Sequence, residues 1–557
     1  MMRRTILFSA AVVLPLLSGA QHKNVYFHQN DGITRVSSTE NIDSIGISKD
    51  QSAASFHFEG KRSVSYNLGM LDSITFNKTI PGASAFPAAS DFKRTVSDTA
   101  EPDYSNVPEP KPSTDDSDFI ENFTVKNNIK FTFNGNSVTV SGSVNGVTVK
   151  TSGAHVTVLS TKGKMRYLLE GTTSDGSFKV ITEEGDADNK KFCLTLNGVN
   201  ITNPKGPAIN IQSGKSVYLL LNKNTVNTLC DGATYSTSAS EDQKGTIFSE
   251  GQLLISGSGT LNITSLGGHG ICSDDYIRLR ANTGKISITS FKDGFNTKDK
   301  FIMYGGDITI NSSKDGVSVR RGPFCLYGGS LDMTCADDGI VSDYTNADTA
   351  NVTIEGGYAR IYTTGSKGHA IATTGALIMK GGAVSATVTG NASKCFNVWN
   401  GISIQGGTAL LKASGEPMYD EEEKEFSSSA CIRSRKNLTV SGGTLSLLNT
   451  GNGGKGINTE LLTDISGGTV TVVSEGDDYA ADGISIRSRA LDTRSLAVSG
   501  TPSVNLSAAK VSLSTIDGMD VSGGSIITYS TGSRANALNV KGTLKQSGGL
   551  IMYGLSE

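Results

Sequence analysis

An Asp-Gly pair followed by a bulky apolar residue recurs at nearly equal spacing along the chain. The phrases "SFKDGFNT", "SSKDGVSV" and "CADDGIVS" place Asp293, Asp315 and Asp338 22 and 23 residues apart. If successive repeats stack, these carboxylates lie about 5 Å apart and repel one another by about 1 kcal/mol per pair in water. A hard divalent cation relieves that repulsion, and calcium prefers clustered oxygen ligands. The spacing therefore predicts a calcium site, for which the further acidic candidates are Asp337, Asp274 and Asp275.

A turn without a metal is the alternative explanation of the same phrases. Asp-Gly is common turn chemistry, in which Asp bonds the backbone and Gly takes a positive φ. Lys292 and Lys314 also supply neighbouring positive charge. In later repeats His369 and then Lys394 hold the Asp position, so the acidic column is confined to three repeats.

A second set of candidates lies on the turn four to five residues after the repeat glycine, or close to it. These candidates are Arg320, Arg321, Tyr344, Trp399, Arg433 and Arg435. Aromatic rings supply apolar faces on which sugars stack. Arginines can form paired hydrogen bonds with the carboxylates of uronic acids. The alternative is a solvated edge whose mixed charges only prevent aggregation.

A repeat of 22 to 25 residues must position both sets. A Gly-Gly pair opens a β-type run nine times, from Gly305 to Gly548. The chain has 65 glycines but only 12 prolines among its 557 residues. At about 3.3 Å per residue, the period fits three short strands and their turns. The LxxLxL pattern of leucine-rich repeats is absent. We therefore predict an all-β chain that forms a right-handed parallel β-helix solenoid of about a dozen coils.

Four segments are predicted. Residues 1–20 have a basic start, an apolar core and a small-residue cleavage site, as in a secretory signal peptide. Residues 21–79 form a small N-terminal β module, and residues 80–118 a Pro/Ser/acidic linker that is extended and largely disordered. Residues 119–557 hold the repeats. No later apolar run reaches the roughly 20 residues of a membrane span.

One long stretch carries a family resemblance. The run "FCLTLNGVNITNPKGPAINIQSGKSVYLLLNKNTVNTLCDGATYS" leads into "GTIFSEGQLLISGSGTLNITSLGGHGICSDDYIRL" and then into the repeated Asp-Gly phrases. From about residue 126 to 557 the chain resembles the parallel β-helix carbohydrate-binding domain family of clostridial plant-cell-wall-degrading bacteria. The resemblance implies a non-catalytic binder of cellulose and pectic acids, with bound calcium and a fold like that of pectate lyases.

We therefore expect a secreted, calcium-dependent protein that binds plant-type or acidic polysaccharides, in the periplasm or on the surface of a Gram-negative bacterium. A net charge of −3 gives no reason to expect a nucleic-acid partner. We expect a monomer, with a possible cell-surface partner.

Two other functions stay open. One is a pectate-type polysaccharide lyase, for which Asp293, Asp315 and Arg320 would supply the metal ligands and the base. The other is a structural or adhesive surface protein. A polygalacturonase is disfavoured, because the Gly-His-Gly at residues 268–270 comes before Asp274 and Asp275, the reverse of the order in those enzymes.

Cys395 and Cys431 occupy the glycine position of successive repeats. They would stack one above the other, either as small apolar filler of the core or as a disulfide.

Overall fold

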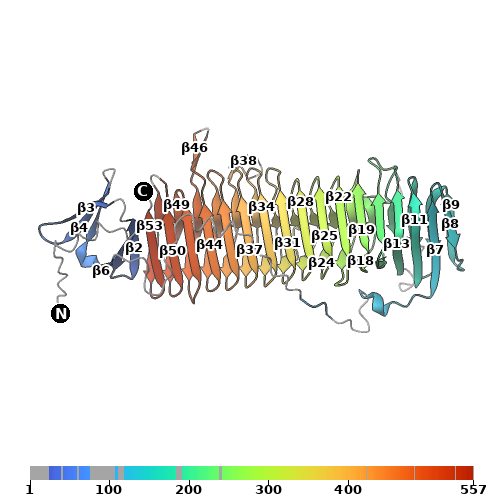
Figure 1. The fold of residues 1–557 in the computed structure, drawn as a ribbon, viewed down its shortest axis with the longest axis horizontal. Coiled ribbons are helices and arrows are strands. Elements are labelled where there is room, and N and C mark those ends of the chain that lie inside the picture. The colour runs from blue at the N-terminus through green and yellow to red at the C-terminus, as the bar shows by residue number, and fades with distance from the viewer. Residues whose placement is uncertain are drawn as a thin grey trace. The chain divides into compact units, whose positions relative to one another are not determined.

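The computed structural model describes residues 24–38, 42–58, 62–75, 107–110, 118–182, 191–236, 241–421, 423–481, 483–532 and 535–555. These residues form 53 strands and two short 3-10 helices, which confirms the prediction of an all-β chain (Figure 1). Within them we find no helix with the length and apolar character needed to cross a membrane. The predicted signal peptide and most of the predicted linker lie outside the described residues, and the predicted domain boundaries stay predictions.

The chain divides into two compact units. The first comprises residues 1–99, 446–458 and 462–557, and the second comprises residues 100–445 and 459–461. β42 (Thr444–Asn449) and β43 (Lys455–Ile465) contain residues of both units.

In the second unit the strands stack in three parallel ladders. From β14 to β34 each strand pairs with the third strand after it, so one turn of the chain supplies one strand to every ladder; β35 and β36 pair with β40 and β41. Ladder 1 comprises β10 (Ala154–Ser160), β12 (Gly176–Thr182), β14 (Ile209–Gln212), β17 (Gly245–Ser249), β20 (His269–Ser273), β23 (Phe295–Thr297), β26 (Val317–Val319), β29 (Ile340–Ser342), β32 (Ile371–Thr373), β35 (Lys394–Val398) and β40 (Ala430–Ser434).

The other two ladders receive the second and third strands of each turn. Ladder 2 comprises β7 (Asn127–Asn134), β11 (Met165–Thr173), β13 (Phe192–Thr202), β15 (Val217–Leu221), β18 (Leu253–Ser256), β21 (Tyr276–Leu279), β24 (Lys300–Met303), β27 (Phe324–Leu326), β30 (Val352–Ile354), β33 (Leu377–Met379), β36 (Ile402–Ile404) and β41 (Leu438–Val440). Ladder 3 comprises the second half of β13, then β16 (Val226–Cys230), β19 (Thr260–Ser265), β22 (Lys285–Ser290), β25 (Asp307–Ser312), β28 (Ser330–Cys335), β31 (Tyr358–Thr363), β34 (Ala383–Val388) and β37 (Thr408–Ala413).

Four short strands and one helix lie outside the ladders of this unit. β8 (Ser137–Ser141) and β9 (Val147–Ser152) pair antiparallel with β7 and β10. β38 (Met418–Asp420) and β39 (Glu425–Ser427) form a hairpin, and η2 spans Ile120–Asn122.

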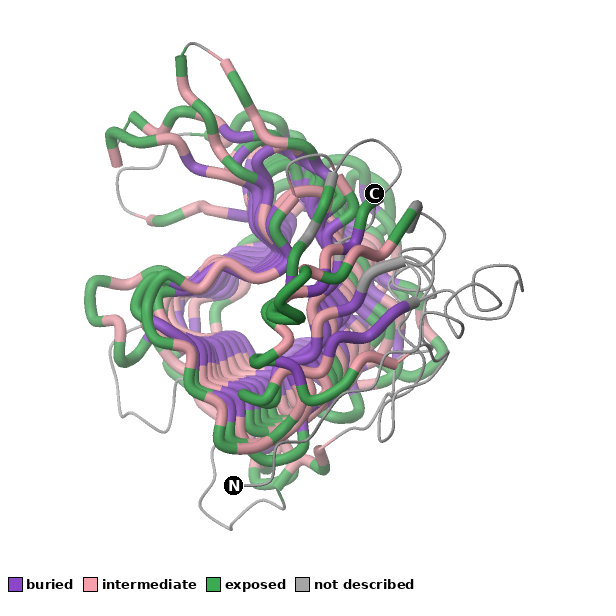
Figure 2. Tube along the Cα trace, turned by 90° about the vertical axis from the view of Figure 1, so that its left-hand side faces the viewer, coloured by how far each residue is buried: buried purple, intermediate pink, exposed green. Residues whose placement is uncertain are grey.

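The core lies inside the stacked turns, where buried residues line the interior of the tube (Figure 2). The apolar residue that follows each repeat glycine points inward on ladder 1, so Phe295, Val317, Ile340, Ile371 and Phe396 stack in one buried column. Alternation of inward and outward side chains along each strand explains why one apolar residue per short strand is enough to hold the turn.

The repeat glycines serve close packing and not a positive φ. A Cβ placed on Gly316 would lie 2.6 Å from the carbonyl oxygen of Gly339, and one on Gly339 would lie 2.3 Å from Ile361 Cγ2. Neither glycine has a positive φ, so that part of the turn chemistry considered for the Asp-Gly phrases is wrong, whereas the Asp side chains do bond the backbone. Positive φ occurs instead at the second glycine of the Gly-Gly pairs, such as Gly306 at 107° and Gly329 at 84°.

A short acidic segment is bound to the outside of ladder 2. Glu109 accepts hydrogen bonds from Arg278 (2.8 Å) and Arg280 (2.7 Å), and Asp118 accepts one from Arg278 (3.0 Å). The ring of Phe119 lies 4.1 Å from the guanidinium of Arg280. Glu109 and Asp118 fall within the predicted linker, and these charge-assisted bonds fix their positions because both arginines are buried beneath them.

The first unit combines N-terminal strands with C-terminal stacked strands. Its N-terminal elements are β1 (Asn24–Gln29), β2 (Ile33–Ser38), β3 (Ile42–Ile47), β4 (Ala53–Phe58), β5 (Arg62–Asn67), η1 (Leu68–Met70) and β6 (Leu71–Thr75). Its C-terminal strands are β44 (Thr469–Ser474), β45 (Tyr479–Ala481), β46 (Ile484–Ile486), β47 (Arg489–Val498), β48 (Ser503–Ala508), β49 (Val511–Val521), β50 (Ser525–Ser530), β51 (Asn536–Val540), β52 (Thr543–Gln546) and β53 (Leu550–Leu555). β2 pairs in parallel with β53, so an N-terminal strand covers an edge that would otherwise be open to pairing with another chain.

All seven cysteines lie in the described residues, and none of them forms a disulfide. Cys395 on β35 and Cys431 on β40 are fully buried on neighbouring strands of ladder 1, which confirms the prediction that they fill the core.

Candidate functional site

Both predicted sets of residues border ladder 1. The Asp-Gly column lies just before or at the start of the strands, and the turn column lies just after them. Between the two borders, the outward side chains of several strands are small, as at Ser318, Val341 and Ala372. We call this surface, with its two borders, the ladder 1 face.

The first border is a chain of hydrogen bonds between successive turns. Each member accepts, through its side chain, the backbone N–H of the equivalent residue one turn on. The acceptor stack runs from His269 to Asp293 (3.2 Å), Asp315 (3.4 Å), Asp338 (3.2 Å), His369 (2.6 Å) and Lys394 (3.0 Å). It ends at Lys394, whose Nζ donates to the carbonyl of Ala392 (2.8 Å) and to Ser427 Oγ (2.6 Å), and the N–H of Ala430 bonds the carbonyl of Ser393 instead.

Two carboxylates of this stack and the adjacent carboxylate of Asp337 are close enough to share a cation. Asp315, Asp337 and Asp338 each place an oxygen within 4.8 Å of the others. Burial and the charge of Asp293 raise the pKa of Asp315 to about 6. Burial and the charge of Asp315 raise the pKa of Asp338 well above its usual value. Burial is the first cause of both raised pKa values and the neighbouring carboxylate is the second, and carboxylate oxygens of this kind suit calcium.

The remaining residues of the stack have partners within the protein. Asp293 lies 3.2 Å from His269 Nδ1, and its carboxylate accepts a hydrogen bond from Asn296 Nδ2 at 2.7 Å. Burial favours the neutral form of Asp293, but its interactions with His269, Asn296 and Lys314 outweigh burial and lower the pKa. Lys314, whose side chain is 54% exposed, lies 3.4 Å from Asp315. Asp293 is therefore better satisfied than the three carboxylates above it.

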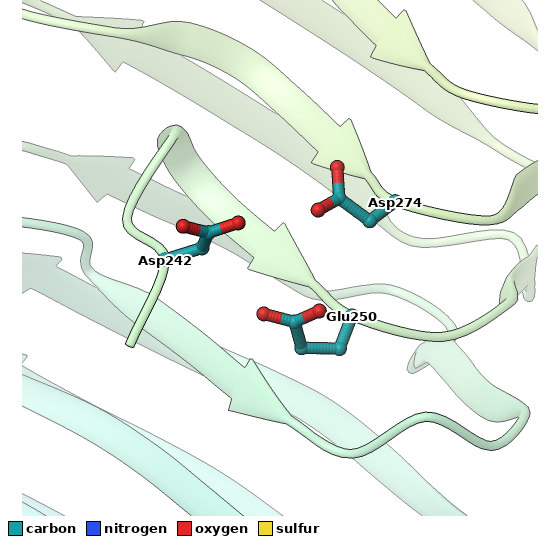
Figure 3. A group of neighbouring side chains, drawn as sticks. All are labelled: Asp242, Glu250 and Asp274. Atoms are coloured by element: carbon teal, nitrogen blue, oxygen red, sulfur yellow. The ribbon is translucent and has the colours of Figure 1, made fainter. Parts of the chain in front are cut away.

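A second acidic group lies near the same face, several turns earlier. Asp242, Glu250 and Asp274 come from the segments around β17 and β20, and their carboxylates point toward one another (Figure 3). Lys244 Nζ lies 2.7 Å from Asp242 and also contacts Asp274, which accepts a further bond from Arg320 at 3.0 Å. Burial opposes ionisation of Asp274, but its bonds to Lys244 and Arg320 dominate and lower the pKa. Lys244 therefore neutralises two of the three carboxylates, whereas burial and the charges of Asp274 and Asp242 raise the pKa of Glu250.

Asp275 belongs to neither acidic group. Its carboxylate contacts Gln252, and burial together with the charge of Asp299 raises its pKa. The structure thus divides the six predicted metal ligands among a central trio, a neutralised cluster and two separately bonded residues.

The second border is a column of turn residues stacked by backbone hydrogen bonds. The N–H groups of Asp274, Lys298, Arg320, Asp343, Thr374, Trp399 and Arg435 each bond a carbonyl of the preceding turn. Trp399 is 46% exposed, and the guanidinium of Arg435 lies 3.8 Å from the centre of its ring. The column therefore presents one large ring to solvent, held in place by a cation on one side.

Three of the predicted carboxylate-binding arginines already bind protein carboxylates. Arg433 is buried and pairs with Glu460 at 2.9 Å, Arg435 contacts Glu423, and Arg320 pairs with Asp274. Arg321 is exposed on the turn after β26. Tyr344 is half-buried, and its backbone N–H bonds Thr374 Oγ1 at 3.0 Å. A glycan on the ladder 1 face would thus meet Trp399 and Arg321 more freely than the paired arginines.

Sequence reasoning missed the residues that neutralise these charges. Lys244 lies before β17, and Glu423 lies on the turn between β38 and β39. Neither occupies a repeated position, so the period gave no signal for them. The acidic run from Asp420 to Glu423 was the one visible signal, and the structure places both of its ends in ion pairs, Asp420 with Lys367 and Glu423 with Arg435.

Comparison with models of known protein families shows which family the chain belongs to. The model of the family described as carbohydrate-binding domain-containing protein matches residues 152–374 and 366–483, together more than half of the chain. The chain belongs to this family. The matched residues include the acceptor stack, the turn column and both acidic groups of the ladder 1 face.

The matches to two individual proteins cover a smaller part of the chain than the family model does. A carbohydrate-binding domain-containing protein of Acetivibrio thermocellus is 30% identical over 149 residues, which cover 26% of this chain and 42% of that protein. The chain thus matches less than half the length of this relative. Among solved structures, a polysaccharide lyase-like protein from C. thermocellum, determined as a gadolinium derivative, is 25% identical, with a TM-score of 0.39. That match covers 45% of this chain and 96% of the solved one.

Proposed function

We propose that this protein is a secreted, non-catalytic polysaccharide-binding protein, that calcium supports its binding, and that its repeats form a right-handed parallel β-helix. The observation that carries the proposal is the turn column of the ladder 1 face, in a chain of the carbohydrate-binding domain-containing family. A flat row of turns suits an extended polymer better than a compact ligand, because successive sugars can meet equivalent positions. Weak contacts repeated along one chain raise the overall affinity through effective concentration.

The proposed calcium ion lies at Asp315, Asp337 and Asp338. The three carboxylates supply hard oxygen ligands that lie close together, and burial and then the charge of a neighbouring carboxylate raise the pKa values of Asp315 and Asp338. Calcium would neutralise the centre of the ladder 1 face, and an oxygen of an acidic glycan would coordinate it as a further ligand. Asp242, Glu250 and Asp274 are the weaker candidates, since Lys244 fills the same electrostatic role.

A glycan array probed with millimolar calcium and with a chelator tests the proposal. We expect retention of plant-type or acidic polysaccharides, strongest with calcium. Ultraviolet absorbance during incubation with polygalacturonate tests the lyase alternative through its unsaturated product. A protein that retains no polysaccharide under either condition would instead be the structural or adhesive surface protein.

A further inference from the structure

A cavity of about 240 Å³ opens at the early end of ladder 1, over β10, β12 and β14. Its lining residues include His155, Ser177, Lys179, Lys205, Asn210 and Gln243. None of the described residues that line it is Phe, Tyr or Trp, so its chemistry differs from that of the exposed Trp399. A polar cavity of this size suits one hydrogen-bonded sugar residue more than a stacked chain.

The walls of the cavity are held in place by their own hydrogen bonds. Asn203 Nδ2 donates to the carbonyl of Pro207 at 2.7 Å, and the N–H of Lys205 donates to Asn203 Oδ1 at 3.1 Å. On the other side, Glu241 accepts bonds from Lys179 (2.7 Å) and Gln243 (2.8 Å). These bonds fix the loop from residue 203 to 207 and the polar side chains opposite it, so the cavity is preorganised.

Asn210 presents an unused donor to this cavity. Its side chain is on β14, opposite Lys179 in the ladder, and the residue is only 3% exposed. Its Oδ1 accepts a bond from Gln212 Nε2 at 2.7 Å, whereas its Nδ2 has no hydrogen-bond partner among the residues that the structure describes. A buried donor left unpaired is unfavourable, and a ligand oxygen in the cavity would satisfy it.

The charges around the cavity leave one lysine available. Lys179 is neutralised by Glu241, and His155 lies 3.3 Å from Asp175. Lys205 is exposed, and no ion pair involves it among the residues that the structure describes. The cavity therefore combines a buried amide donor with a single uncompensated cation, which favours a ligand that carries both hydroxyl groups and a carboxylate.

We infer that this cavity binds one uronic acid residue of an acidic polysaccharide. Lys205 pairs with the carboxylate, Asn210 Nδ2 donates to a ring or hydroxyl oxygen, and Ser177 and Gln243 exchange hydrogen bonds with hydroxyl groups. The inference rests on the proposed polysaccharide-binding function and adds a site for an acidic sugar at one end of ladder 1.

Ser177, His155 and Asp175 have binding roles in this assignment. Ser177 Oγ lies 3.0 Å from His155 Nδ1, and His155 Nε2 faces Asp175. This order of groups resembles a nucleophile chain, but the Asp175 side chain is 58% exposed, so water weakens its hold on the imidazole. Ser177 is therefore assigned to hydrogen bonding with the sugar and not to attack on it.

Titration of the full chain with trigalacturonate, followed by calorimetry, tests the inference. Its fully methyl-esterified form is the ligand control, because it lacks only the carboxylate charge. We expect the ester to bind at least tenfold more weakly. Lys205→Gln should weaken trigalacturonate binding about tenfold, and Lys223→Gln, an exposed lysine outside the cavity, should not change it.

Gly206→Val provides a second test by filling the cavity. A Cβ on Gly206 would meet only the side-chain tips of Gln243 (3.2 Å) and Asn203 (3.6 Å), and its φ is not positive. Loss of trigalacturonate binding in this variant, with an unchanged melting temperature, is the expected result. If neither Gly206→Val nor Lys205→Gln alters trigalacturonate binding, the inference is overturned while the proposed function stands. If the unaltered protein binds no polysaccharide at all, both fail together.

Discussion

Each of the two acidic groups of the second unit holds three carboxylates, but the two groups differ in the positive charge that lies beside them. Asp242, Glu250 and Asp274 surround Lys244, whose ammonium contacts two of the three carboxylates. Asp315, Asp337 and Asp338 are as closely spaced, but their nearest ammonium is the half-exposed one of Lys314. The difference teaches that carboxylate spacing alone does not define a metal site. The count of internal cations decides whether an external one is needed.

The largest effect is expected on the pH dependence of the unfolding free energy in the absence of calcium. It tests the difference between the two acidic groups. Burial and Asp293 raise the pKa of Asp315 to about 6, so the folded state binds this proton more tightly than the unfolded state does. The resulting stability is present below about pH 4 and is lost as the pH rises through about 6. A shift of roughly two units corresponds to about 3 kcal/mol. Urea unfolding in a chelating buffer should show a smaller loss in Asp315→Asn than in the unaltered protein, because Asp338, whose pKa burial also raises, remains in the variant.

The control for that experiment is calcium itself. Saturating calcium should suppress the loss of stability, because it stabilises the ionised carboxylates. The same pH slope in the unaltered protein and in Asp315→Asn would mean that this carboxylate is not under electrostatic stress.

The next effect is stabilisation by calcium. A ligand present at about 100 times its dissociation constant stabilises the folded state by about 2.7 kcal/mol. Asp338→Asn should remove most of this gain, since it deletes a ligand charge but keeps an oxygen that can accept the N–H of His369. Asp242→Asn, in the neutralised cluster, should keep the gain. Thermal unfolding with and without calcium measures both, and equal gains in the two variants would remove the distinction between the clusters.

Lys244→Met should convert the neutralised cluster into an unneutralised one. Its ammonium is about one-third exposed, so we expect a loss of about 1–2 kcal/mol in unfolding free energy, less than for a fully buried ion pair. Millimolar calcium should restore part of the loss. Lys285→Met, an exposed lysine on ladder 3, is the matched control and should leave stability unchanged. Destabilisation of Lys244→Met that calcium does not reduce would contradict the electrostatic role of Lys244.

The smallest expected effect concerns the turn column. Trp399→Ala should weaken binding of polygalacturonate about fivefold, since one aromatic contact contributes on the order of 1 kcal/mol. Tyr362→Ala is the matched control, because Tyr362 is 40% exposed on ladder 3, away from the ladder 1 face. Equal affinities of the two variants in affinity electrophoresis would remove Trp399 from the proposed binding surface.

The sequence period was enough to predict which residues stack. Asp293, Asp315 and Asp338 do form one column, and Arg320, Trp399 and Arg435 lie on another, because parallel ladders place residues one repeat apart directly above one another. The period also led to the glycine positions, although their reason is close packing and not the turn geometry that the Asp-Gly phrases suggest.

The partners of these columns could not be predicted in the same way. Lys244 and Glu423 come from irregular segments, and Glu109 and Asp118 reach Arg278 across about 160 residues of sequence. Contacts of this kind depend on loop paths that no repeat encodes. The cavity beside Asn210 was missed for a similar reason, since its walls come from three turns and the loop from residue 203 to 207.

Equilibrium binding of polygalacturonate to the full chain, in millimolar calcium and in a chelating buffer, tests the central claim most directly. The account predicts saturable binding in calcium, at least tenfold weaker binding after chelation, and no release of unsaturated product. Absence of binding in both buffers, together with no retention of any neutral plant polysaccharide, would contradict it.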